Sequence, residues 1–164
     1  MRGTALDLPL HRERIDRLAD ILGGADPDDP RQPELDVDLG LTRVVWIGTA
    51  QDVGAAINPV AVEGQIEGGT AQGLGLALME EIRTRDGLIT NASFTDYLIP
   101  TALDMPPVTS ELVEDPEPDA PYGVKGVGEP PTVVSTAAVV SALRSATGRE
   151  LTRVPVRPDD VVGL

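Results

Sequence analysis

The chain has 164 residues and contains no cysteine. It can therefore form no disulfide bond, no zinc–thiolate site and no iron–sulfur cluster of its own. Its single histidine, His11, cannot build a metal site alone. We therefore predict no metal centre that is ligated by protein side chains.

Aromatic and basic residues are also scarce. With one Trp, two Tyr and one Phe, the core is expected to consist of Val, Leu, Ile and Ala, and the 41% hydrophobic content fits a folded domain. The 13 basic residues against 27 acidic ones give a formal charge of −14. This charge argues against binding to nucleic acid phosphates or to anionic membranes.

Long hydrophobic runs are missing as well. No stretch approaches the ~18 consecutive apolar residues of a membrane span. The N-terminal sequence MRGTALDLPLHRERIDRL has no apolar core of signal-peptide length. We therefore expect the protein in the cytoplasm.

The chain is predicted to divide near residue 34. Residues 10–22 have apolar side chains at helical spacing, and two glycines follow them, which predicts a short amphipathic helix. Residues 25–33 combine three prolines with three aspartates and are typical of a linker. We interpret residues 1–33 as an N-terminal extension and residues 34–164 as the domain.

Strand-like and helix-like patterns alternate from residue 34 onward. An alternating run at 35–39 and a β-rich run at 42–50 predict an antiparallel hairpin with a turn at Gly40. The further elements expected are a helix over 60–83, a turn at 85–87, a strand over 108–113, a helix over 133–147 that ends at Gly148, and a strand within 150–162. The predicted fold class is α+β, with a mixed sheet packed against two helices rich in Gly and Ala.

The first of these helices is unusual for its five glycines. Each interior glycine costs roughly 0.5 to 1 kcal/mol relative to alanine, so something must offset the cost. Close packing within the protein and a flat cofactor against the glycine faces both remain open. Gln65 and Gln72 lie about two turns apart on one side of this helix, where exposed polar residues would also be ordinary.

The sequence PYGVKGVGEPP at 121–131 places one carboxylate, Glu129, at the end of a glycine-rich loop. Glycines at 123, 126 and 128 allow positive φ and close approach to a ligand. The two prolines that follow predict a helix start, where the macrodipole and free N–H groups favour a negative charge. Glu129 is therefore a candidate general base, although such loops are also common connectors. Asp96 and Tyr97, in contrast, adjoin no polar cluster in sequence, and we interpret them as structural.

Three motifs together closely resemble the C-terminal part of the molybdenum-binding subunit of the xanthine dehydrogenase and aldehyde oxidase family. They are DVGAAINPVAVEGQIEGGTAQGLGLALMEE at 52–81, FTDYLIPTALDMPP at 94–107 and PYGVKGVGEPP at 121–131. They occur in the family's order, and the resemblance runs from about residue 35 to about residue 161.

This resemblance implies a molybdenum hydroxylase that oxidises a purine, another N-heterocycle or an aldehyde with oxygen from water. The implied cofactor is molybdopterin in its cytosine dinucleotide form, with iron–sulfur clusters and FAD on partner chains. Glu129 matches the base that deprotonates the metal-bound hydroxyl, and Gln65 matches the glutamine that reaches the molybdenum site. The other implied cofactor contacts are the dinucleotide-lining Ile57 and Asn58, and the backbone N–H groups of Lys125, Gly126, Val127 and Gly128.

The family's molybdenum subunit is several times longer than this chain, and its other cofactor-binding loops lie upstream of the matched part. Two hypotheses follow. The chain is an enzyme component that completes its site with the remaining molybdenum-subunit portion and with iron–sulfur and flavin subunits. Alternatively, it is a truncated non-catalytic remnant or an interaction module. The sequence does not fix the substrate.

Overall fold

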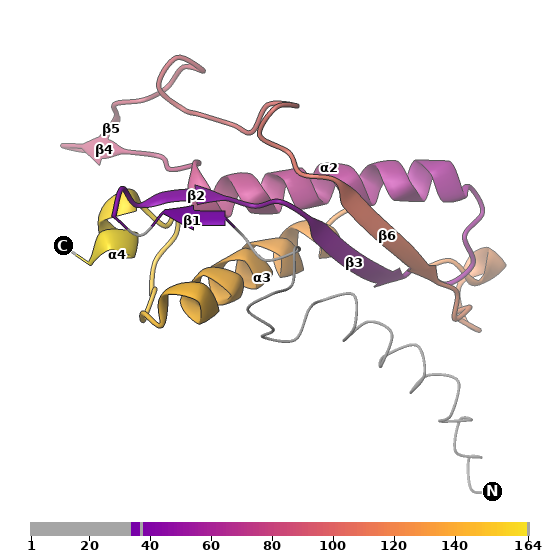
Figure 1. Cartoon of the computed structure of the whole chain (residues 1–164). Coiled ribbons are helices and arrows are strands. Elements are labelled where there is room, and N and C mark those ends of the chain that lie inside the picture. Colours follow the sequence, from indigo (N-terminus) through magenta and orange to yellow (C-terminus); the bar gives the residue numbers. More distant parts are fainter. Residues whose placement is uncertain (1–33, 37, 164) are drawn as a thin grey trace, which may run out of the picture.

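The computed structural model describes residues 34–36 and 38–163 (Figure 1). The predicted N-terminal extension at 1–33, with its helix and linker, lies outside this part. Two long helices, α2 (Pro59–Leu78) and α3 (Pro130–Thr147), lie against each other and form the centre of the molecule. The α+β class with two small-residue helices is therefore confirmed.

Glycines bring α2 and α3 into direct contact. A β-carbon placed on Gly73 would lie 2.5 Å from Ser135 Cβ, and one placed on Gly69 would lie 2.8 Å from Pro131 Cβ. Thr136 Oγ1 donates a hydrogen bond of 3.0 Å to the carbonyl oxygen of Gly73. On this face of α2 the glycines therefore permit close packing within the protein, which was one of the two expected explanations.

Both ends of α3 agree with the sequence signals, but α2 ends earlier than predicted. Gly148, in a left-handed conformation with φ 65°, forms the C-cap of α3. α2 ends at Leu78 rather than at residue 83, because the N–H groups of Met79 and Glu80 both bond to Gly75 O. The chain then leaves the helix axis, and the buried Asn91 side chain bonds to Glu81 O and the Arg83 N–H.

The predicted hairpin is confirmed only in its first half. β1 (Glu34–Asp36) pairs antiparallel with β2 (Leu41–Arg43). The second half of the β-rich run is instead part of β3 (Ile47–Asp52), which pairs in parallel with β6 (Val108–Val113). A parallel pair needs a long crossover connection, and α2 with the segment after it provides one.

Two short strands follow α2. β4 (Thr84–Arg85) and β5 (Leu88–Ile89) form a two-residue hairpin. Its turn residues Asp86 and Gly87 both have positive φ, 52° and 79°, as such hairpin turns require. The predicted turn at 85–87 is thus confirmed.

The predicted last strand is not present. Residues 150–157 pair with no strand of the described part, and the chain ends in the short helix α4 (Pro158–Val162). Pro158 favours a helix start, and Asp160 Oδ2 accepts a hydrogen bond of 2.8 Å from the Arg157 N–H. The proline and this cap explain why the segment turns into a helix instead of continuing extended.

The strands form three separate two-stranded sheets, not one mixed sheet, within the described residues. The outer edges of β3 and β6 pair with no further described strand. The aliphatic core lies between the C-terminal half of α2, the inner face of α3 and the C-terminal segment, and its members are Leu74, Ala77, Val139, Leu143, Leu151, Val156 and Val161. No helix in the described part is both long and apolar enough to cross a bilayer.

Candidate catalytic and cofactor-binding site

Glu129 is the N-cap residue of α3, as the proline signal predicted. Its carbonyl oxygen accepts hydrogen bonds from the N–H groups of Thr132 (3.0 Å) and Val133 (3.3 Å). Its side chain is exposed, and within the described part it makes no hydrogen bond or ion pair. The backbone of Glu129 is therefore fixed at the helix start, and its carboxylate has no partner among the described residues.

The expected free N–H groups of the helix N-terminus are not present. Pro130 and Pro131 occupy the first two helical positions and have no N–H, and the Thr132 N–H already bonds to Glu129. The unpaired N–H donors lie in the loop just before Glu129. Gly126, Val127 and Gly128 have backbone N–H groups with no hydrogen-bond acceptor among the described residues.

The expected positive φ is confirmed for one of the three loop glycines, Gly123, and not for the other two. Gly123 has a positive φ of 69° and follows Tyr122, which also has a positive φ of 59°, in the 3-10 turn η1 (Pro121–Gly123). Gly126 and Gly128 do not have positive φ. A β-carbon on Gly126 would meet nothing within 4 Å. These two glycines therefore leave the loop surface bare instead of allowing an unusual backbone turn.

The loop is anchored to the end of β3. The Ala55 N–H donates to Gly123 O at 2.9 Å, and the Lys125 N–H donates to Val53 O at 3.0 Å. Between them, Gly54 has a φ of 66°, and a β-carbon there would overlap Gly123 O. Two segments that are about seventy residues apart in sequence are thus joined by their backbones.

The side chain of Lys125 reinforces this junction. Its Nζ lies 2.7 Å from Asp52 Oδ2 and 3.5 Å from Asp115 Oδ2. The hydrogen bond to Asp52 raises the pKa of Lys125 above its ordinary value of 10.5. Because the backbone N–H and the ammonium of Lys125 both have partners, the expected N–H contacts to a cofactor are reduced to residues 126–128.

We expect Lys125→Met to loosen this junction. Hydrogen exchange at the Ala55 and Lys125 amides should accelerate several-fold, while exchange within α3 stays unchanged, because the lost ion pair is local. In the wild-type protein the ion pair should persist up to pH 10.5 and weaken only at higher pH, since the pKa is raised. Unchanged exchange at both amides would contradict the anchoring role.

Gln65 is brought next to the loop. A β-carbon placed on Gly128 would lie 3.7 Å from Gln65 Oε1. Gln65 is exposed on α2, whereas Gln72, two turns further on, accepts a hydrogen bond of 3.1 Å from Thr132 Oγ1. Gln65 and Glu129 are thus close to the same loop, and Gln72 joins the two helices.

Part of α2 near Gln65 is open. β-Carbons placed on Gly64 and Gly68 would meet nothing within 4 Å. Helix packing within the described part therefore does not explain these two glycines, in contrast to Gly69 and Gly73. For this side of the helix, the expectation of a ligand against the glycines remains a prediction.

Ile57 and Asn58 lie at the start of α2. The side chain of Ile57 is 68% exposed. Asn58 is the N-cap of α2, and its Oδ1 accepts a hydrogen bond of 3.2 Å from the Ala61 N–H. Asn58 therefore has a structural role, which a sequence signal (Asn before Pro at the helix start) could have revealed.

We expect Asn58→Ala to destabilise the chain by about 1 kcal/mol, because the cap of α2 is lost. The free energy of unfolding from urea denaturation would measure this. Asn58→Asp is the matched control, since it retains a capping oxygen and should remain close to wild type. Equal losses in both variants would contradict the capping role.

Tyr97 makes a structural hydrogen bond, in agreement with its interpretation from the sequence, whereas the structural interpretation of the Asp96 side chain stays a prediction. The Tyr97 hydroxyl donates a hydrogen bond of 2.6 Å to Glu80 Oε2, which raises the pKa of Tyr97. The Asp96 N–H bonds to Ser93 O at 3.0 Å. No group of three His, Cys, Asp or Glu side chains in the described part could hold a metal ion.

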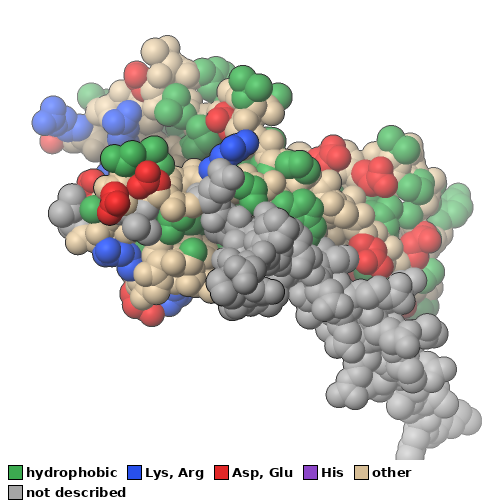
Figure 2. Space-filling view, in the orientation of Figure 1, with side chains coloured by type: hydrophobic (Ala, Val, Ile, Leu, Met, Phe, Trp, Pro, Cys, Tyr) green, Lys and Arg blue, Asp and Glu red, His purple; other side chains and the backbone are tan. Residues whose placement is uncertain are grey.

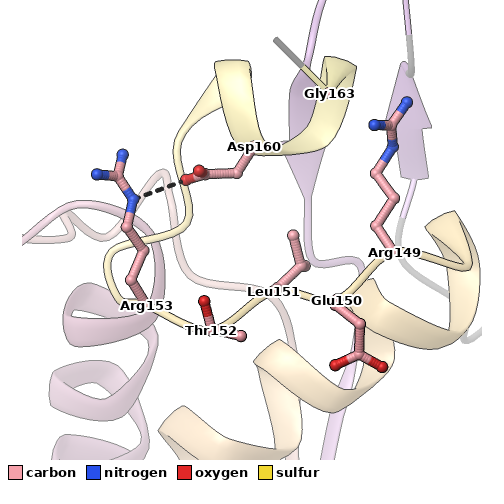
Figure 3. A pocket seen from close by; sticks show the side chains of 7 residues that line it. All are labelled: Arg149, Glu150, Leu151, Thr152, Arg153, Asp160 and Gly163. Atoms are coloured by element: carbon pink, nitrogen blue, oxygen red, sulfur yellow. Dashed lines mark hydrogen bonds and ion pairs between the residues drawn. The ribbon is translucent and has the colours of Figure 1, made fainter.

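A separate shallow pocket of about 430 Å³ lies beyond the other end of α3 (Figure 3). Its charged side chains are already engaged: Arg153 Nε lies 3.2 Å from Asp160 Oδ2, and Arg149 donates to Val162 O. The lining residues are Arg149, Glu150, Leu151, Thr152, Arg153, Asp160 and Gly163. This pocket is remote from Glu129 and does not belong to the candidate site.

Known proteins are similar to this chain in sequence and in fold. The molybdopterin cofactor-binding domain model matches residues 32–106. The chain is 39% identical over 129 residues to the xanthine dehydrogenase molybdenum-binding subunit of Escherichia coli O157:H7, covering 76% of this chain and 17% of that protein. It belongs to the xanthine dehydrogenase and aldehyde oxidase family of molybdenum-binding subunits.

Further relatives in this family have different names. The gamma subunit of the 6-hydroxypseudooxynicotine dehydrogenase complex of Paenarthrobacter nicotinovorans is 41% identical over 134 residues, with 79% of this chain and 17% of that protein covered. The quinoline 2-oxidoreductase structure from Pseudomonas putida 86 superimposes with a TM-score of 0.74 at 38% identity, covering 79% of this chain and 17% of that chain. The chain thus spans about a sixth of the length of the relatives it matches.

The site fits the family's molybdenum cofactor. A large polar cofactor needs hydrogen-bond donors and a surface without obstructing side chains. The N–H groups of residues 126–128 provide unpaired donors, and Gly64 and Gly68 leave open space beside Gln65. The chemistry of these groups is thus compatible with holding one side of the cofactor.

Proposed function

We propose that this chain supplies the general base and one wall of the cofactor site in a molybdenum hydroxylase. The observation that carries the proposal is the position of Glu129. Its unpaired carboxylate stands directly after a loop with three unpaired N–H groups, and Gln65 lies beside that loop. The proposed reaction is the oxidative hydroxylation of a purine, another N-heterocycle or an aldehyde.

Each residue has a proposed task. The N–H groups of residues 126–128 and the Gln65 amide donate hydrogen bonds to the cofactor, and Ile57 and Asn58 line its proposed cytosine dinucleotide end. When bound, the molybdenum cofactor supplies the two-electron oxidation. A carboxylate oxygen of Glu129 accepts the proton released as the oxygen nucleophile attacks the substrate, which is general-base catalysis worth about 10² to 10⁴-fold.

The proposed assembly extends beyond this chain. The remaining molybdenum-subunit portion supplies the rest of the pocket, and partner chains supply iron–sulfur clusters and FAD, since this chain has no cysteine. The cytoplasmic location remains a prediction. The second candidate is a non-catalytic remnant or interaction module, and the short span of the chain relative to its relatives is compatible with both candidates.

The molybdenum and pterin content of the purified chain tests the proposal. The chain would be expressed alone, and then with the E. coli O157:H7 molybdenum-binding subunit from which the matched region has been deleted. We expect metal and pterin only on co-expression, because the chain holds one side of the site. The deleted subunit with its own excised region is the positive control. Metal in that control but not with this chain would favour the remnant.

A further inference from the structure

Residues 82–103, which we call the outer segment, carry large apolar side chains on their outside. The exposed fraction is 97% for Leu103 and 80% for Phe94. The complete set of exposed large apolar residues in the segment is Ile82, Leu88, Ile89, Phe94, Leu98, Ile99 and Leu103. Figure 1 shows this part of the chain extending away from α2 and α3, and Figure 2 shows apolar side chains on the same projection.

The outer segment has a defined shape although it buries little apolar surface. Polar bonds hold it in place: Asn91 is 3% exposed and bonds to the backbone of Glu81 and Arg83. The Tyr97 hydroxyl bonds to Glu80, as described above. The segment therefore presents its apolar side chains on an ordered surface.

A second polar bond pair orders the far end of the segment. Asp104 Oδ2 accepts hydrogen bonds of 2.7 Å from both the N–H and the hydroxyl of Thr101. This turn fixes the position of the neighbouring Leu103. The most exposed apolar side chain of the segment is thus held outward by a structured turn.

The larger part of the outer segment, from Leu88 to Leu103, is depleted in charge. Asp96 is the one charged residue there, whereas 24% of the whole chain is charged, and the other charged residues of the segment, Arg83, Arg85 and Asp86, lie at its start. Depletion of charge together with exposed aromatic and aliphatic side chains is typical of the centre of a protein interface. Contiguous exposed apolar patches in folded proteins mark such contact surfaces.

We propose that the outer segment is the surface through which this chain docks onto the remaining portion of the molybdenum subunit. This inference rests on the proposed function. The family model covers residues 32–106, so the segment belongs to the shared domain and is not an insertion. In the relatives about five-sixths of the polypeptide lies outside the matched region, and that polypeptide is the occupant that best explains the patch.

Charge-introducing substitutions test the docking surface. The probe is again the E. coli O157:H7 subunit lacking its matched region, and the affinity of the full 164-residue chain for it is measured by titration calorimetry. We expect Leu103→Asp and Phe94→Asp each to weaken binding at least about tenfold. Both should leave the melting temperature of the chain alone nearly unchanged, since these side chains are exposed. The matched control is Leu41→Asp on β2, 59% exposed and outside the segment, which should bind as wild type.

The outcomes separate this inference from the proposed function. If both variants bind the subunit and load molybdenum as the wild type does, the docking proposal is overturned and the proposed function is left intact. Binding that depends on the segment, without molybdenum in the complex, would support the docking surface and overturn the proposed function. If the chain associates with itself and both variants abolish this self-association, a second copy of the chain covers the outer segment and the inference is overturned. Equal weakening by Leu41→Asp would also overturn it.

Discussion

Glu129→Gln is expected to lower kcat of the assembled enzyme by about 10² to 10⁴-fold, the range that a positioned general base contributes. The amide keeps the size and the hydrogen-bonding capacity of the carboxylate but cannot accept the proton. Molybdenum and pterin content should remain normal, because the proposed cofactor contacts come from residues 126–128 and Gln65. Steady-state turnover and metal analysis on the same preparation would measure both effects.

Glu67→Gln is the matched control for this experiment. Glu67 is also an exposed carboxylate, on α2, and has no assigned role in the reaction. Its neutralisation should leave kcat within about twofold of wild type, as surface changes usually do. Normal turnover by Glu129→Gln would remove Glu129 from the mechanism, and a loss of molybdenum in this variant would make it a cofactor contact instead.

Gly73→Val is expected to destabilise the chain by about 3 kcal/mol, at the upper end of the usual cost of overpacking. A β-carbon at this position would lie 2.5 Å from Ser135 Cβ and 3.1 Å from the Thr136 nitrogen. The Ser135 side chain cannot easily rotate away, because its Oγ donates a hydrogen bond of 2.5 Å to Pro131 O within α3. The free energy of unfolding from urea denaturation would measure the loss.

Gly68→Val on the same helix provides the comparison. A β-carbon there would meet nothing within 4 Å, so the new side chain clashes with no described residue, and the lost glycine gains helix propensity of a few tenths of a kcal/mol. Stability should therefore be unchanged or slightly higher. If the two variants lost the same free energy, contact with α3 would not be the reason for Gly73.

Local signals in the sequence located both helices and the candidate base. The prolines after Glu129 marked the start of α3, and Gly148 marked its end. These signals are reliable because they depend on one or two residues, such as a proline that lacks an N–H or a glycine that accepts a left-handed backbone. The place of Glu129 could thus be derived before any tertiary contact was known.

Contacts between distant segments could not be derived in the same way. The parallel pairing of β3 with β6 joins residues that are about sixty positions apart, and strand patterns do not name their partners. Lys125 contacts Asp52 through its ammonium and Val53 through its backbone N–H, and these contacts likewise join segments that are far apart in sequence. The error about free N–H groups was local, however, since the two prolines themselves exclude donors at the start of α3.

The open edges of the β3–β6 sheet affect how long an unassembled chain persists in a cell. Unpaired strand edges can join to other chains, so an unassembled copy is exposed to aggregation and to quality-control proteases. In the described part no strand covers either edge. We therefore expect the abundance of this polypeptide to follow that of its partner: copies made in excess should be degraded faster than assembled copies, and matched synthesis should protect them.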